Sequence, residues 1–126
     1  MFNEITKLER IQKRNNLNEV YVLGPAHPVN GGFHRYEIVG STQEHKKTLL
    51  NISFQSGPRN EPDSEAGVLD TDLLEIVRHR LNAFQKGAFS NRETALALTH
   101  VEEALLWLTK RAEDRFEKGI LGKNIK

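Results

Sequence analysis

The sequence predicts a small α+β protein, in which an antiparallel β-sheet core is followed by a C-terminal αα-hairpin with a long second helix. Two observations support this class. The front half contains short segments of alternating apolar residues separated by glycine- and proline-containing turns. The back half contains two stretches of unequal length in which apolar residues recur every three or four positions. At 126 residues, we expect one domain over 1–126, with a β-rich core and loop at about 1–67 and a helical hairpin at about 70–119.

The N-terminal segment gives only a weak pattern. Between Asn3 and Arg14, the apolar residues Ile5, Leu8 and Ile11 follow each other at three-residue spacing. This spacing is compatible with a short appended helix or with a frayed arm. The segment is charged throughout and has no apolar stretch of the kind found in signal peptides.

Three segments read as strands, at Glu19–Leu23, Phe33–Val39 and Thr48–Gln55. Gly24-Pro25 ends the first strand, and the turn sequence Asn30-Gly31-Gly32 precedes the second. In the third strand, alternation places Leu50, Ile52 and Phe54 on one face. An antiparallel sheet with one apolar face needs a cover, and the helices that follow can supply it.

The segment Ser56–Gly67 contains two prolines, two glycines and several charges. A loop of roughly a dozen residues is long enough to carry a function. It can equally be a crossover connection from the sheet to the first helix, and the sequence does not choose between these roles.

The hairpin is marked by capping signals. Asp70 or Thr71 can cap the first helix, which ends near Lys86-Gly87. Ser90 and Glu93 have the spacing of a capping box at the start of the second helix, which runs to about Lys118-Gly119. The apolar stripe of the first helix comprises Leu73, Leu74, Val77, Leu81 and Phe84, and the seam of the second comprises Leu98, Val101, Leu105, Leu108 and Ala112.

The two helices have unequal lengths, about 24 Å and about 40 Å at the usual helical rise. The last turns of the second helix, residues Arg111–Glu117, therefore extend past the first helix, and we call them the overhang. Their apolar side chains need a cover, either from the sheet or from a second copy of the chain.

Composition excludes several classes of function. There is no cysteine, which suits a reducing cytosol and excludes disulfide and thiolate chemistry. The net charge of +1 argues against a DNA- or RNA-binding protein, and no stretch approaches the ~20 apolar residues of a membrane span. The five histidines lack metal-ligand spacing, and no nucleophile or phosphate-loop motif is present. We therefore expect no catalytic residues, no metal and no cofactor.

Arg111 and Arg115 form the most informative pair. At i, i+4 they share one helical face, with Cβ atoms about 6 Å apart. Two guanidinium groups at this spacing suit a pyrophosphate or a cyclic phosphodiester, because each can bind oxygens in bidentate fashion. From spacing alone, ion pairs with Glu113, Asp114 or Glu117 on an exposed helix end are the favoured explanation of the pair.

A family resemblance adds to this reading. The stretch from Leu73 to Arg115, LLEIVRHRLNAFQKGAFSNRETALALTHVEEALLWLTKRAEDR, resembles the C-terminal hairpin of the phage anti-Thoeris and anti-CBASS cyclic-nucleotide sponges. FQSGPRNEPDSEAGV, at Phe54–Val68, resembles the loop before that hairpin. The chain length is similar to the anti-Thoeris branch, which has a β-core. The resemblance implies stoichiometric capture of a cyclic ADP-ribose isomer, the immune signal of a TIR-domain sensor, in the cytoplasm of the infected bacterial host.

The resemblance also implies site residues. Phe84 would stack on the adenine, and Arg111 and Arg115 would hold the phosphates. Thr94 stands where the family often has asparagine, and threonine is a shorter partner for a base or ribose.

A second pocket is implied for cyclic di- or trinucleotides, with Arg59 and Arg92 as candidates. Family members bind their signal at a dimer interface, and many form hexamers. This chain is accordingly expected to form a homodimer, or a hexamer built as a trimer of dimers.

Helix arithmetic favours an oligomer independently. Phe84 lies across the hairpin turn from Thr94, and Arg111 lies roughly 26 Å farther along the second helix. One copy cannot bring Phe84 and Arg111 onto one small ligand, whereas two antiparallel hairpins can.

Two other functions compete with the sponge reading. The protein could hydrolyse the signal instead of holding it. Alternatively, it could be a non-enzymatic adaptor whose hairpin binds a partner protein, with Phe84, Leu106 and Trp107 as contact residues. On the sponge reading, Trp107 belongs to the dimer interface or the sheet core.

Overall fold

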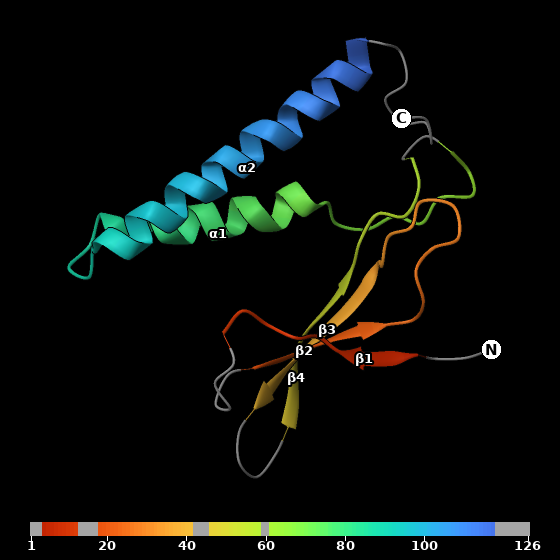
Figure 1. The fold of residues 1–126 in the computed structure, drawn as a ribbon, viewed down its shortest axis with the longest axis horizontal. Helices are drawn as coiled ribbons and strands as arrows, with labels where there is room; N and C mark the ends of the chain where they lie inside the picture. The colour runs from red at the N-terminus through yellow and green to blue at the C-terminus, as the bar shows by residue number, and fades with distance from the viewer. Residues whose placement is uncertain (1–3, 13–17, 42–45, 59–60, 118–126) are drawn as a thin grey trace.

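The protein has the predicted α+β fold, a four-stranded antiparallel sheet followed by two helices, the second of them long (Figure 1). The structure is a computed structural model that describes residues 4–12, 18–41, 46–58 and 61–117. The elements are β1 (Ile5–Lys7), β2 (Glu19–Leu23), β3 (Arg35–Ser41), β4 (Lys46–Ser53), α1 (Asp70–Gln85) and α2 (Arg92–Glu117). The strands lie side by side in chain order, and each neighbouring pair is antiparallel.

The N-terminal segment forms an edge strand, which corrects both options considered from the sequence. Ile5–Lys7 pairs with β2, and Ile5 lies opposite Leu23. The backbone N–H of Leu8 donates to the carbonyl of Val20 at 2.8 Å, which continues the ladder. A three-residue strand gives almost no periodic signal, and its pairing with β2 outweighs the weak helical spacing.

One face of the sheet is apolar, as the alternation in β4 predicts. The register places Leu50 opposite Ile38 and Ile52 opposite Tyr36, so these residues share a face. Phe54, just after β4, packs edge-on against Tyr36, with ring centroids 5.6 Å apart. This side of the sheet therefore carries a cluster of apolar and aromatic residues.

The other face contains a carboxylate that links three strands. Glu19 of β2 pairs with Lys7 of β1 and with Lys46 of β4, each at 2.9 Å, and Tyr21 donates a hydrogen bond to it at 2.9 Å. The Glu19 side chain is only 15% exposed. Hydrogen bonds from Lys46, Lys7 and Tyr21 lower the pKa of Glu19 from 4.5 to about 2, and Glu19 in turn raises the pKa of Lys46.

This network predicts acid sensitivity of the sheet. Because the pKa of Glu19 is lower in the folded chain than in the unfolded chain, its contribution is complete above about pH 5 and is lost as the pH falls toward 2. In urea unfolding, we expect Glu19→Gln to lower the urea midpoint at pH 6. We also expect the midpoint of this variant to decrease less between pH 6 and pH 3 than that of the unaltered protein. Glu9→Gln, at an exposed position outside the network, should change neither the midpoint at pH 6 nor its decrease toward pH 3. An equal pH dependence in Glu19→Gln and the unaltered protein would contradict this assignment.

The two ends of the loop between sheet and hairpin are paired with each other. Phe54 and Val68 form a parallel bridge, and Ser56 and Glu65 form an antiparallel one. The N–H of Gln55 donates to the carbonyl of Val68 at 2.8 Å, and the N–H of Val68 donates to that of Ser53 at 2.9 Å. These two hydrogen bonds attach the end of β4 to the residues that lead into α1, and we call this contact the joint.

The helix caps differ from the sequence-based expectation by one or two residues. Leu69 is the N-cap residue of α1, and its N–H donates to the Asp72 carboxylate at 2.8 Å, so neither Asp70 nor Thr71 is the cap. Asn91 caps α2, because its Oδ1 accepts from the N–H of Thr94 at 2.7 Å, and Ser90 lies outside the cap. Asparagine ranks beside serine as an N-cap, so composition alone does not choose between the neighbours.

Of the two predicted helix C-terminal ends, the structure describes the one of α1. α1 ends at Gln85, near the expected Lys86-Gly87, and Lys86 closes it in a right-handed helical conformation. The expected end of α2 at Lys118-Gly119 lies outside the described residues. Neither helix, within the described residues, is long and apolar enough to cross a membrane.

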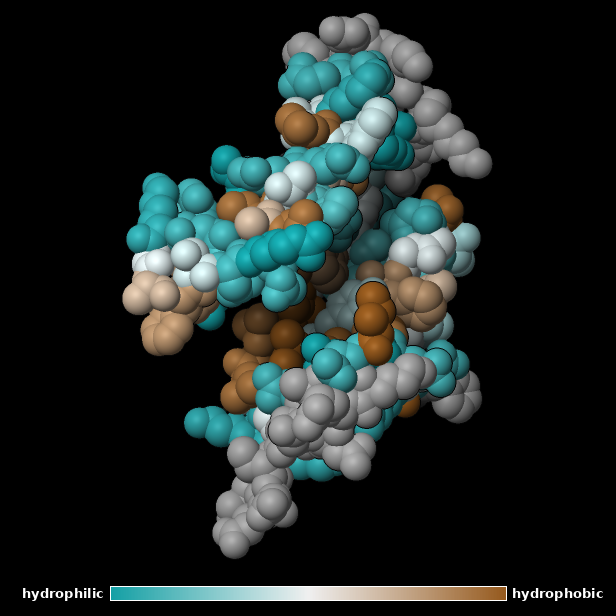
Figure 2. Space-filling view, turned by 60° about the vertical axis from the view of Figure 1, so that its left-hand side comes forward, coloured by the Kyte–Doolittle hydropathy of each residue, from teal (hydrophilic) through white to brown (hydrophobic). Residues whose placement is uncertain are grey.

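The hairpin does not cover the sheet as closely as expected. No Cα atom of either helix lies within 8 Å of a strand in the described part of the chain. Figure 2 shows hydrophobic residues gathered around the hollow between helices and sheet, and Leu50 remains 47% exposed. Elsewhere in the described residues, Ile76 is 58% exposed and Leu106 is 71% exposed. A single copy therefore leaves much of its apolar surface uncovered.

Candidate functional site

The hairpin turn is held by one side chain from each helix end. The side-chain amide of Gln85 donates to the backbone carbonyl of Asn91 and accepts from the backbone N–H of Asn91, both at 3.0 Å. The Asn91 side chain also donates to the carbonyl of Phe89 at 3.0 Å. The turn is thus preorganised, because the last residue of α1 is hydrogen-bonded to the N-cap residue of α2.

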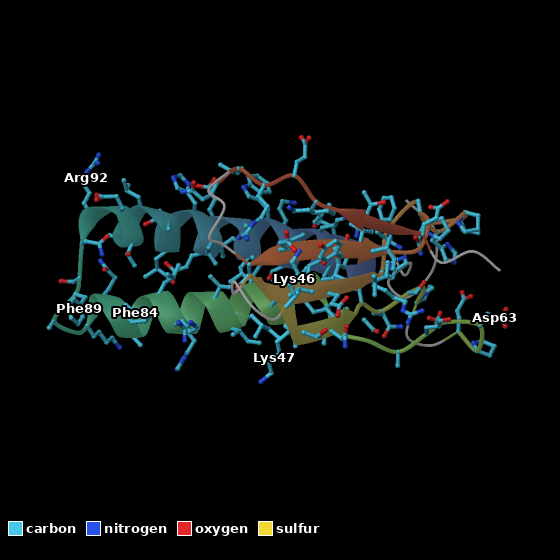
Figure 3. The ribbon with its side chains drawn as sticks, turned by 90° about the horizontal axis from the view of Figure 1, so that it is seen from below. Lys46, Lys47, Asp63, Phe84, Phe89 and Arg92 are labelled. Carbon is cyan, nitrogen blue, oxygen red and sulfur yellow. The ribbon has the colours of Figure 1, made fainter. Side chains whose placement is uncertain are left out.

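Two of the expected ligand-binding residues lie beside the hydrogen-bonded pair of Gln85 and Asn91. Phe84 immediately precedes Gln85 and is 45% exposed. Thr94 lies in the first turn of α2 and is bonded through its N–H to Asn91. Figure 3 shows Phe84, Phe89 and Arg92 together at this end of the molecule, and Phe89 is 81% exposed. The turn therefore presents aromatic rings and a cation to solvent.

Phe84 has a cationic neighbour. The guanidinium carbon of Arg80 lies 5.4 Å from the centroid of the Phe84 ring. Sequence reasoning did not single out Arg80 or Gln85. The available signal for Arg80 was its surroundings, since the residues three and four positions away on α1 are Ile76, Val77, Ala83 and Phe84.

Arg111 and Arg115 lie on α2 beyond the end of its partner helix. The continuous helix from Arg92 to Glu117 confirms that they share a face at i, i+4 spacing. Arg111 is exposed and Arg115 is half-buried. Asp114, one of the expected partners, pairs with Lys110 at 2.8 Å, and no ion pair among the described residues includes Arg111.

The six expected residues fall into separate groups. Phe84, Thr94 and Arg92 lie at the hairpin turn, whereas Arg111 follows Thr94 by 17 residues, roughly 26 Å along the helix axis. Arg59 lies outside the described residues. One chain consequently holds an aromatic group and a pair of cations that cannot reach the same small ligand.

A cavity of about 800 Å³ lies elsewhere, at the sheet end reached by the loops after β2 and β4. Its charged and imidazole-bearing residues are Glu4, His27, His34, Arg35, Asp63 and Glu65. Among the described lining residues, three carboxylates against one arginine disfavour a phosphate-bearing ligand. Figure 3 shows Asp63 at the opposite end of the molecule from Phe84, and none of the five expected site residues that the structure describes lines this cavity.

An ion pair links the two helices of the hairpin. Arg78 of α1 pairs with Glu102 of α2 at 2.8 Å, and this hydrogen bond raises the pKa of Arg78. No group of three or more His, Asp or Glu side chains in the described residues could hold a metal ion. The exposed rings at the turn can stack on a ligand, and the exposed arginines of the hairpin can bind anions.

Two exposed apolar residues lie on α2. Leu106 is 71% exposed and Trp107 is 65% exposed. Trp107 therefore does not belong to the sheet core of a single chain, which excludes one of the positions considered for it.

Part of the sheet and most of the hairpin are similar in sequence to known proteins. The model of the family described as Acb2/Tad1, hairpin domain, matches residues 46–113, more than half of the chain. The protein "Thoeris anti-defense 1" of Bacillus phage SBSphiJ7 is 43% identical over 74 residues. The aligned region covers 59% of this chain and 51% of that protein, so the chain matches about half the length of this relative.

Proposed function

The chain belongs to the Acb2/Tad1 hairpin domain family, and from this premise we propose that it is a phage anti-defence sponge. It binds a cyclic ADP-ribose-type immune signal in the cytoplasm of the infected host and sequesters it without degrading it. The observation that carries the proposal is the family match, which includes all of α1 and α2 up to residue 113. Its relative from a Bacillus phage bears the name of a Thoeris anti-defence protein.

The proposed pocket is shared between two copies. In an antiparallel pair, the hairpin turn of one copy meets the overhang of the other, so Phe84 and Thr94 lie near the partner's arginines. Such a two-fold arrangement creates two equal pockets. It also buries exposed apolar helix surface, and the exposed apolar residues of the single chain support this need.

We therefore expect an oligomer in solution. At micromolar concentration, sedimentation velocity or light scattering should give a dimer or a hexamer made of three dimers. The physical reason is that no large side chain among the described residues is fully buried in a single copy. A monomer at this concentration would remove the shared pocket and with it the proposed site.

The contacts available can support tight binding. A sponge that works at nanomolar signal needs about −12 kcal/mol. Stacking on an aromatic ring contributes roughly 1–3 kcal/mol per base, and hydrogen bonds to charged groups contribute roughly 1.5–3 kcal/mol each. A preformed turn reduces the entropy lost on binding. Capture of this kind requires no general base.

The test is titration calorimetry against a cyclic ADP-ribose isomer and a set of cyclic di- and trinucleotides, followed by heating to release the ligand. Tight binding with intact ligand after heating supports a sponge. Recovery of a cleaved product instead indicates a hydrolase. The oligonucleotides also test the second pocket, for which Arg92 at the hairpin turn and Arg59 are the proposed contacts.

The second candidate function is a protein-interaction adaptor. The observation in its favour is the exposure of Leu106 and Trp107 on α2. Absence of binding to every nucleotide in the titration would make this the leading function. An oligomer that buries both residues would argue against it.

A further inference from the structure

Arg80 differs from Arg78 and Lys110, two other cations of the described hairpin, in its surroundings. Arg78 pairs with Glu75 and Glu102, and Lys110 pairs with Asp114. No carboxylate pairs with Arg80 among the described residues, and its contact is with the Phe84 ring. The positions three and four residues away are apolar, so α1 itself offers it no ion-pair partner.

The ring contact does not satisfy the guanidinium of Arg80. A cation over an aromatic ring interacts through the flat face of the guanidinium, whereas the five N–H donors lie in its plane. These donors need acceptors when water is removed. In the free chain water can supply them, because Arg80 is exposed.

Oligomer formation would change this balance. Arg80 lies three or four residues from the exposed apolar residues Ile76, 58% exposed, Val77, 41% exposed, and Phe84 on α1. A second copy that covers these residues takes the guanidinium out of water, and an unpaired cation in such a place is costly. An anion beside Phe84 would offset that cost.

We propose that Arg80 is a further ligand-binding residue that contacts a phosphate of the nucleotide stacked on Phe84. This inference rests on the proposed function and extends it, because it places a phosphate-binding cation on the same chain as the stacking ring. Arg80 holds the Phe84 ring from one side, the base occupies the other side, and the N–H groups of Arg80 donate to a phosphate oxygen. The phosphates are thus held from both copies.

The test compares Arg80→Gln with the matched control Arg78→Gln, which removes the same charge two residues away. Affinity for the cyclic ADP-ribose isomer, measured by calorimetry between 50 and 300 mM salt, should fall about tenfold to a hundredfold in Arg80→Gln. The remaining affinity should depend less on salt. The affinity of Arg80→Lys should lie between those of Arg80→Gln and the unaltered protein. Arg78→Gln should bind as the unaltered protein does.

Oligomer formation in the absence of ligand distinguishes a ligand-binding role of Arg80 from a structural one. If Arg80 needs an anion, Arg80→Gln should assemble as tightly as the unaltered protein or more tightly in sedimentation equilibrium. Weaker assembly together with weaker binding would show a structural role and overturn the proposal, as would unchanged affinity and salt dependence.

Inorganic pyrophosphate, used as a second probe, separates this inference from the proposed function. If the unaltered protein binds pyrophosphate and Arg80→Gln does not, the phosphate contact stands even where no cyclic nucleotide binds. If the unaltered protein binds neither probe, both the proposed function and the Arg80 contact are overturned.

Discussion

Arg111→Ala should reduce the affinity for the cyclic ADP-ribose-type ligand by at least about a hundredfold while the protein stays folded and oligomeric. A guanidinium that binds phosphate oxygens through two charged hydrogen bonds contributes roughly 3 kcal/mol or more, and about 1.4 kcal/mol corresponds to a factor of ten. The fold should be unaffected, because the Arg111 side chain is exposed on α2. Titration calorimetry measures the loss, and circular dichroism and sedimentation check the fold and the assembly.

Its neighbours on α2 provide the controls. Arg115→Ala should cause a loss of similar size, because Arg115 shares the helical face of Arg111. Arg111→Lys keeps the charge but not the bidentate geometry, so it should recover only part of the affinity. Lys110→Ala removes a positive charge from the same turn on another face, where Lys110 forms a surface pair with Asp114, so it should bind normally. Unchanged affinity in both arginine variants would refute the proposed role of the pair.

The sequence predicts the hairpin better than the sheet edge, for a physical reason. Helical periodicity accumulates over many residues, and α1 and α2 have 16 and 26 of them. β1 has three residues, and its existence depends on pairing with β2, which no local pattern reports. The shift of the α2 cap from Ser90 to Asn91 has the same origin, since the Gln85 side chain selects Asn91 across the turn.

The candidate site is only partly readable from one chain. The i, i+4 spacing places Arg111 and Arg115 on one face, and the structure keeps that arrangement. Neither spacing nor periodicity reveals Arg80 over Phe84, because a ring contact between a cation and an aromatic residue is only one of several fates for an exposed arginine. The cover of the sheet could not be predicted, since it depends on whether helices fold back on their own strands or on a second copy.

The placement of the hairpin depends on a glycine at the joint. A Cβ atom built on Gly67 would lie closer than 3.0 Å to the carbonyl oxygen of Ser53 and the carbonyl carbon of Phe54, and 2.7 Å from the nitrogen of Gln55. All three are backbone atoms, which cannot rotate away as a side chain can. Only a residue without a side chain allows the two segments to approach this closely.

Gly67→Ala should therefore destabilise the protein by about 2–4 kcal/mol, because it forces the joint apart and leaves its two backbone hydrogen bonds unmade. Urea unfolding measures this loss. Gly87→Ala is the matched control, because its Cβ would meet only the carbonyl oxygens of Phe84 and Ala83, at 3.6 and 3.7 Å. It should be neutral or stabilising by less than about 1 kcal/mol. Equal stabilities of the two variants would contradict the role assigned to the joint.

The same substitution should weaken ligand binding without touching the ligand. No Cα atom of a helix lies within 8 Å of a Cα atom of a strand in the described residues, so the joint is what sets the direction in which the hairpin leaves the sheet. A pocket completed by a second copy requires both hairpins to leave their sheets at the same angle. Among molecules that remain folded, Gly67→Ala should thus show lower affinity in calorimetry and weaker assembly in sedimentation, whereas Gly87→Ala should change neither. Normal affinity in folded Gly67→Ala would mean that the pocket is built by the hairpins alone, independently of the sheet.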